Sequence, residues 1–239
     1  MRMGLDLGGT KIEAVVIDAK GEIVWRDRQP TPANNYQHII DLIGTIVAHA
    51  DRDIGAQLSV GIGMPGSLSP RTGRVRNSNT LCLNGENLQQ DLESNLNRQV
   101  RLANDANCFA LSEATDGAGA NAQSVFGVIL GTGCGGGLVF DKKLQNGANS
   151  IGGEWGHNPL AAPKADEMPG PDCYCGRRGC NEVWISGSGF ARDHLAVTGQ
   201  ELSSEQIIAA KTPEAQASFE RLSDRLARAL GAVINLVDP

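Results

Sequence analysis

One pattern occurs twice in this chain: a short apolar strand, a turn rich in glycine and threonine, and a second strand. In the first copy, strands at 3–7 and 12–18 flank the turn of "DLGGTK". In the second copy, "GTGCGGG" at 131–137 lies between strands at 125–130 and 138–140. The repetition indicates two similar halves. Because backbone N–H groups at a glycine turn bind anions, two such turns together indicate a polyphosphate ligand.

The remaining segments also alternate between helices and strands. Apolar side chains recur at helical spacing and predict amphipathic helices at 36–50, 88–97 and 214–237. Further strands are expected at 23–28, from residue 58 into a Gly/Pro-rich loop, and at the start of the strand–turn–helix segment 100–114. This order of elements predicts an α/β chain.

The small residues at 115–122, "TDGAGANA", mark the expected domain boundary. We therefore expect an N-terminal α/β domain at 1–117, which holds the first glycine turn. A C-terminal α/β domain at 118–239 is expected to hold the second.

Composition argues against two classes of partner. The formal net charge is −6, and no cluster of Lys and Arg stands out, so nucleic-acid binding is not expected. No apolar run of membrane-spanning length is present, and Asp6 interrupts any signal-peptide core, so no membrane partner is expected. These features predict a cytoplasmic protein.

The cysteines are concentrated in one short stretch. Of the six in the chain, Cys173, Cys175 and Cys180 lie in "DCYCGRRGC". In a reducing compartment such a cluster is more often a metal site than a disulfide. With the imidazole of His157 it completes a Cys3His set, which is typical of a structural Zn²⁺ site. Reduced buried thiols or a redox pair are the alternatives.

Five stretches carry a resemblance to a known family. "DLGGTK", "NDANCFALSEA", "GTGCGGG", "GEWGHNPL" and "CYCGRRGCNE" resemble the ROK family of bacterial sugar kinases across essentially the whole chain. "GEWGHNPL" and "NSNTLCLNG" are most similar to its fructokinase and mannokinase branch. The resemblance implies a two-domain actin/hexokinase/Hsp70-like (ribonuclease H-like) α/β fold with a ligand cleft between the domains, and it also implies the Cys3His zinc.

The resemblance implies an activity as well: ATP-dependent phosphorylation of a hexose, closest to fructose becoming fructose 6-phosphate. N-acetylglucosamine, glucose and mannose are the alternative sugars. The expected partners are a hexose and ATP with Mg²⁺, and the expected assembly is a homodimer. Asp105 matches the general base of the family, because phosphoryl transfer to a hydroxyl needs an acceptor for its proton. The alternative role for Asp105 is a helix N-cap.

Several residues match family positions that contact the sugar. Their polar side chains suit vicinal hydroxyls, since carboxylates accept the hydrogen bonds that hydroxyls donate. The matching residues are Asn104, Glu154, His157 and Glu182, with Pro65 and Gly66 shaping the pocket and Asn79 reaching the sugar. For Glu182 the alternative is a surface charge. Zinc on one ring nitrogen of His157 is expected to leave the other N–H for a sugar oxygen.

The two glycine turns supply the expected phosphate contacts. Asp6 resembles the carboxylate on the Mg²⁺ side, although it could simply end a strand. The first turn offers Gly8, Gly9, Thr10 and Lys11, and the second offers Gly131, Thr132 and Gly133. The glycines at 135–137 are expected to let the backbone approach closely.

The last helix ends at Asp238 and Pro239. In family members the corresponding "DP" leads into another strand, a glycine-rich turn at the adenosine and a closing helix. We therefore expect a C-terminal domain that is truncated relative to the family. This keeps open a function of another class, a non-catalytic sugar-binding remnant or sensor that lacks the adenosine-binding segment.

Overall fold

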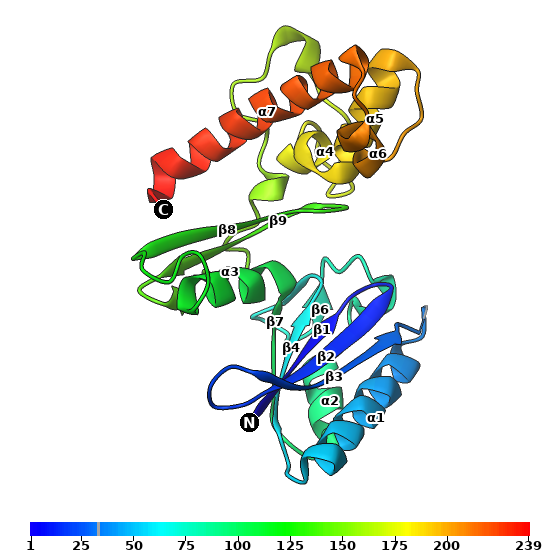
Figure 1. The fold of residues 1–239 in the computed structure, drawn as a ribbon, viewed down its shortest axis with the longest axis vertical. Coiled ribbons are helices and arrows are strands. Elements are labelled where there is room, and N and C mark those ends of the chain that lie inside the picture. Colours follow the sequence, from blue (N-terminus) through cyan, green and yellow to red (C-terminus); the bar gives the residue numbers. More distant parts are fainter. Residues whose placement is uncertain (33) are drawn as a thin grey trace. The chain divides into compact units, whose positions relative to one another are not determined.

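Residues 1–32 and 34–239 are described by the computed structural model (Figure 1). They form two units: unit 1 contains residues 1–108 and 146–151, and unit 2 contains residues 109–145 and 152–239.

The division falls inside α3 (Asp105–Thr115), before the expected boundary at residue 117. The physical reason is packing, because Ala110 and Ala114 are buried together with Val139 of unit 2. Residues 146–151 return to unit 1, where the backbone carbonyl of Asn149 accepts a hydrogen bond from Arg76.

Unit 1 is built on a five-stranded sheet in the order β3-β2-β1-β4-β7. Its strands are β1 (Arg2–Leu7), β2 (Lys11–Ile17), β3 (Ile23–Pro30), β4 (Ser59–Met64) and β7 (Val100–Asn104). The first three form an antiparallel meander, while β4 runs parallel to both β1 and β7. The strands predicted for this half are therefore confirmed.

Two amphipathic helices, α1 (Tyr36–Ile54) and α2 (Leu88–Leu96), complete the core of unit 1. Their apolar stripes bury side chains such as Ile39, Ile43 and Leu92 against the alternating inward side chains of β1 and β2. Smaller elements follow β4: the hairpin of β5 (Ser67–Leu68) with β6 (Val75–Arg76), and the 3-10 turn η1 (Leu81–Leu83).

Unit 2 begins with the antiparallel strands β8 (Ser124–Leu130), β9 (Cys134–Phe140) and β10 (Lys143–Leu144). The expectation of a turn over 131–137 is wrong, because β9 already begins at Cys134 and its glycines pair with Gly127–Ile129. The absence of side chains there allows close packing. A Cβ on Gly136 would lie 2.8 Å from the Trp155 ring.

The rest of unit 2 consists of an irregular segment with two 3-10 turns, followed by helices. Its elements are η2 (Trp155–His157), η3 (Ala165–Glu167), α4 (Asn181–Ile185), α5 (Gly187–Thr198), α6 (Ser204–Ala209) and α7 (Pro213–Val237). The predicted last helix is confirmed as α7, which begins at a Thr212 cap whose side chain accepts from the N–H of Ala215. Leu222, Leu226 and Leu230 pack on the core around Trp155 and Trp184.

A buried ionic network bonds helix α7 to the irregular segment that precedes α4. Glu167 is 4% exposed and accepts hydrogen bonds from Arg225 (2.9 Å) and Arg228 (2.8 Å) of α7. Asp193 of α5 accepts a hydrogen bond from a second nitrogen of Arg225 at 2.8 Å. The Arg225 guanidinium lies 4.4 Å from the ring centre of Trp184. Every charge in this cluster therefore has an opposite partner, which a buried charge requires.

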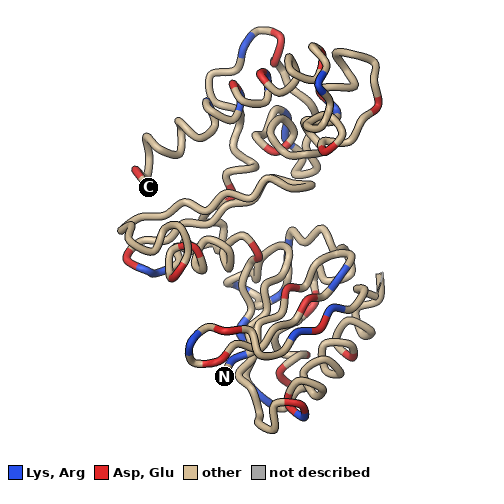
Figure 2. The backbone as a smooth tube through the Cα atoms, in the orientation of Figure 1, with Lys and Arg blue, Asp and Glu red and all other residues tan. Residues whose placement is uncertain are grey.

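Acidic and basic residues are interspersed along both units (Figure 2). Within the described part of the chain, no helix has both the length and the hydropathy needed to cross a bilayer.

Candidate active site and metal centre

Asp105, the predicted general base, and Asp6, the predicted carboxylate on the Mg²⁺ side, lie at the same edge of the unit 1 sheet. Asp6 of β1 pairs with Gly63 of β4, which in turn pairs with Ala103 of β7, two residues before Asp105. Because these strands are parallel, their carboxyl ends meet at one edge, where ligands of open α/β sheets bind. Both carboxylates have accessible side chains.

The two carboxylates also interact electrostatically. Desolvation by surrounding protein raises the pKa of Asp105 above its ordinary value, despite the hydrogen bond that it accepts from the N–H of Ala106 at 2.8 Å. Desolvation, followed by repulsion from Asp105, raises the pKa of Asp6. A carboxylate with a raised pKa is a better proton acceptor at neutral pH, as general-base chemistry requires.

Asn104, and not Asp105, makes the capping interaction of α3. The Asn104 Oδ1 accepts from the backbone N–H of Asn107 at 3.2 Å, the bond that an N-cap residue makes. Its Nδ2 donates to the carbonyl of Gly66 at 3.0 Å. The predicted sugar-contacting amide is therefore fixed at both ends, and it also hydrogen-bonds the Asp105 side chain.

Gly66 is in a conformation that only glycine adopts without strain. Its φ is +79°, and a Cβ there would lie 2.5 Å from the carbonyl oxygen of Arg76. The neighbouring Pro65 is buried and Asn79 is exposed. Gly66 therefore shapes the loop through close backbone approach, and its carbonyl holds Asn104 in place.

The first glycine turn is held by its own backbone. The N–H of Gly8 donates to the carbonyl of Lys11 at 2.9 Å, and Thr31 bonds the carbonyls of Gly8 and Thr10. Because the Gly8 N–H is already bonded within the turn, the expected phosphate contacts are left to Gly9, Thr10 and Lys11.

Thr80 is a candidate site residue that the sequence patterns do not indicate. Its buried Oγ1 has no hydrogen-bond partner among the described residues, and it lies 3.4 Å from where a Cβ on Gly9 would be. An orphaned donor beside a glycine turn fits a phosphate ligand.

The second glycine turn is supported by two segments that follow it in unit 2. Ser188 donates from its hydroxyl to the carbonyl of Thr132 at 2.6 Å, and the N–H of Gly187 donates to the carbonyl of Gly131 at 2.7 Å. The Glu182 carboxylate accepts from the N–H of Cys134 at 3.1 Å. Glu182 is therefore half-buried against the turn, which disfavours the surface-charge alternative.

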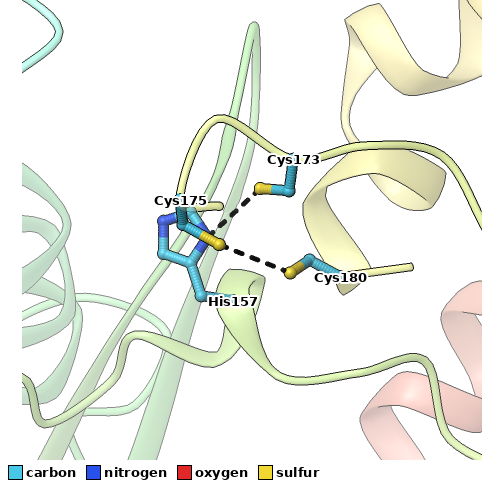
Figure 3. A group of neighbouring side chains, drawn as sticks. All are labelled: His157, Cys173, Cys175 and Cys180. Carbon is cyan, nitrogen blue, oxygen red and sulfur yellow. Dashed lines mark hydrogen bonds between the residues drawn. The ribbon is translucent and has the colours of Figure 1, made fainter. Parts of the chain in front are cut away.

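The thiols and the imidazole predicted to bind metal converge in unit 2 (Figure 3). The ligand atoms of His157, Cys173, Cys175 and Cys180 all lie within 4.8 Å of one another. Cys175 and Cys180 place their sulfurs 3.7 Å apart, too far for a disulfide. Sulfurs at Zn–S distances of about 2.3 Å on a tetrahedron are about 3.8 Å apart, so this donor set fits zinc.

His157 directs its two ring nitrogens to different groups. Nδ1 lies 3.7 Å from the Cys173 sulfur, on the side of the thiols. Nε2, the nitrogen expected to meet a sugar oxygen, lies 3.0 Å from the hydroxyl of Tyr174. Burial and then the negative charge of Glu182 raise the pKa of this phenol, and the charge of Glu154 adds to the effect. In the structure Nε2 thus contacts the Tyr174 hydroxyl, and its bond to a sugar oxygen stays a prediction.

The comparisons with known proteins agree with these features. Residues 2–239 match the ROK family. N-acetyl-D-glucosamine kinase of Escherichia coli O127:H6 is 42% identical over 246 residues, which cover the whole of this chain and 81% of that protein.

Solved structures give the same assignment. The ROK hexokinase of Thermus thermophilus superposes with a TM-score of 0.86 at 30% identity, over all of this chain and 78% of that one. A ROK family glucokinase of Streptomyces griseus, solved with glucose and AMPPNP, has a TM-score of 0.80 at 29% identity, over all of this chain and 80% of that one. The predicted actin/hexokinase-like fold class is confirmed, and the chain belongs to the ROK family of ATP-dependent sugar kinases.

Proposed function

We propose that this protein transfers the γ-phosphoryl group of ATP to a hydroxyl of a hexose, with Asp105 as the general base. The observation that carries the proposal is the Asp105 carboxylate itself. It is accessible, it lies at the carboxyl edge of the sheet, and its pKa is raised. The N-cap bond, which was the alternative role for Asp105, is made by Asn104. A base in this position accepts the proton of the attacking hydroxyl.

The remaining residues divide the task by unit. In unit 1, the sugar is contacted by Asn104 and Asn79, and its pocket is shaped by Pro65 and Gly66. The phosphates are contacted by Gly9, Thr10 and Lys11. In unit 2, the sugar partners are Glu154, His157 and Glu182, and the second phosphate turn is Gly131, Thr132 and Gly133. Carboxylates accept from sugar hydroxyls, whereas backbone N–H groups donate to phosphate oxygens.

Two metals belong to this proposal. Mg²⁺ bound with ATP offsets the phosphate charge, and Asp6 would hold it. Zn²⁺ would be held by His157, Cys173, Cys175 and Cys180, whose sulfur spacing suits it. Its contribution is rigidity, since it fixes the ring of His157. The assembly we propose is a homodimer, which light scattering behind a sizing column tests.

N-acetyl-D-glucosamine is the sugar we propose first, because a kinase of that sugar is 42% identical over the whole chain. Fructose is the second candidate, on the motif resemblance of "GEWGHNPL" and "NSNTLCLNG".

The test is ADP release with Mg-ATP and each of N-acetylglucosamine, fructose, mannose and glucose. Asp105→Asn keeps the shape of the side chain and removes the base, so kcat should fall by about 10²- to 10⁴-fold while calorimetry still detects sugar. The matched control is Asp116→Asn, at an exposed residue just after α3, which should retain the parent rate. A parent rate in Asp105→Asn contradicts the assignment. Sugar binding without turnover in the unsubstituted protein would favour the non-catalytic alternative.

A further inference from the structure

Tyr174 is an exposed aromatic residue whose hydroxyl is turned toward the protein. It lies between two candidate zinc ligands, Cys173 and Cys175, and it is 76% exposed. Nevertheless, its hydroxyl lies 3.0 Å from Nε2 of His157, and the two rings meet edge-on with their centres 5.1 Å apart. One polar contact, and not burial of the ring, therefore determines where this side chain lies.

The contact occupies the only ring nitrogen of His157 that is directed away from the thiols. Nδ1 faces the Cys173 sulfur, so Nε2 is the position at which a ligand can bond this imidazole. A phenol offers one donor and lone pairs as acceptor, the same set that a sugar hydroxyl offers. The Tyr174 hydroxyl therefore lies at the ring nitrogen to which a sugar is assigned.

Resting on the proposed function, we propose that Tyr174 is an internal competitor of the sugar. In the unliganded protein its hydroxyl holds the Nε2 position of His157, sugar binding displaces it, and Tyr174 thereby sets the affinity for the sugar.

Displacing the Tyr174 hydroxyl from His157 should cost little free energy. The ring is exposed, so rotating it outward sacrifices little apolar contact, and one neutral hydrogen bond is lost. Competition of this kind reduces apparent affinity by the fraction of molecules in which the site is open. Removing the hydroxyl should therefore strengthen sugar binding by about two- to tenfold, the range that corresponds to one neutral hydrogen bond.

The experiment compares Tyr174→Phe with the unsubstituted protein, using N-acetyl-D-glucosamine and D-fructose as the probes. We expect a lower sugar Kd by calorimetry and a lower sugar KM, with kcat and the KM for ATP unchanged. The matched control is Tyr36→Phe, which removes the other tyrosine hydroxyl of the chain, bonded to Asp91 at 2.6 Å in unit 1. It should leave the sugar Kd unchanged.

A spectroscopic readout follows the displacement itself. With two tyrosines in the chain, incorporation of 3-fluorotyrosine gives two fluorine resonances, and the two Phe variants assign them. Added sugar should shift the Tyr174 resonance and leave that of Tyr36 in place.

The outcomes separate this inference from the function on which it rests. If sugar binds but the Tyr174 resonance stays in place, or the Kd of Tyr174→Phe is unchanged or higher, the competitor role is overturned and the kinase assignment stands. If the unsubstituted protein neither binds nor phosphorylates any of the sugars, the proposed function is overturned and this role with it.

Discussion

The carboxylate of Glu182 accepts a hydrogen bond from the backbone N–H of Cys134 at 3.1 Å. This contact joins the start of α4, immediately after the last candidate zinc ligand, to the end of the second glycine turn. A Cβ on Gly133 would lie 2.8 Å from the same carboxylate, so the glycine leaves room for this approach. The candidate metal centre and the second glycine turn of unit 2 are therefore connected through one side chain.

The Glu182–Cys134 contact predicts different effects for two substitutions. Glu182→Gln keeps an acceptor for the N–H of Cys134 but loses the charge, so it should raise the sugar KM by about tenfold with little change for ATP. Glu182→Ala removes both, and the KM for ATP should rise as well because the turn loses its support. Steady-state kinetics with each substrate varied in turn measures both effects. Equal effects of the two variants on ATP would contradict the link.

The proposed zinc site predicts that metal content depends on the thiol cluster. Cys175→Ser should lower bound zinc from about one equivalent to near zero, because serine is a poor zinc ligand, and the Tm should fall. Elemental analysis of the purified protein is the measurement. Cys82→Ser, a thiol of unit 1 outside the cluster, should keep its zinc. A zinc-free protein with an unchanged Tm would contradict the site.

The Glu167 network predicts how stability changes with pH. Although burial opposes it, hydrogen bonds from Arg228, the Lys164 backbone and Arg225 lower the pKa of Glu167 from 4.5 to about 2. A carboxyl with a lowered folded-state pKa stabilises the protein above the unfolded value, and this contribution is lost as pH falls through the folded value. The stabilisation should therefore be complete above about pH 5 and should disappear as pH falls toward 2.

Glu167→Gln tests this assignment, because it removes the charge that Arg225 and Arg228 share and leaves Asp193 as the remaining charge partner of the buried Arg225. The variant should unfold about 10 °C lower at neutral pH. The gap in Tm from the unsubstituted protein should narrow as pH falls below 4.5. Asp166→Asn, at the exposed neighbouring residue, should show no such gap. A difference that is independent of pH would contradict the role of the carboxylate.

The backbone at Gly66 predicts a large effect of a single methyl group. Gly66→Ala places a Cβ 2.5 Å from the Arg76 carbonyl at φ +79°, so it combines backbone strain with a clash. We expect a loss of about 10 °C in Tm and a raised sugar KM, because Asn104 loses its anchor. Gly73→Ala has a similar φ of +70° with nothing within 4 Å, and it should cost only a few degrees. Equal losses in Tm would show that strain alone matters.

Sequence patterns predicted the elements of unit 1 well, because each carries a strong local signal. The alternation over β1 and β2 and the apolar stripe of α1 both match the structure. The composition of the glycine run at 135–137 indicates a turn. Pairing with β8 determines its conformation instead, and pairing is a non-local effect.

The site was predictable where one short motif supplies it. The three cysteines and His157 were identified from spacing and chemistry, and the structure brings them together. Thr80 lies in "NSNTLCLNG" and Tyr174 in "DCYCGRRGC", but neither motif indicates what these two side chains contact. Their significance comes from what the fold places beside them, Gly9 in one case and His157 in the other. A single sequence contains no local signal for such contacts.

Two clusters of side chains, among other contacts, join the segment from Asn158 to Gly179 to the rest of unit 2. One is the thiol and imidazole cluster, and the other is Glu167, held by α7. The entropy cost of closing a loop grows with its length, so a midpoint anchor converts one long closure into two shorter ones. The first fastening depends on reduced thiols and the second on an ionised carboxyl. Oxidation of the thiols and protonation of Glu167 should therefore weaken two different anchors of the same segment.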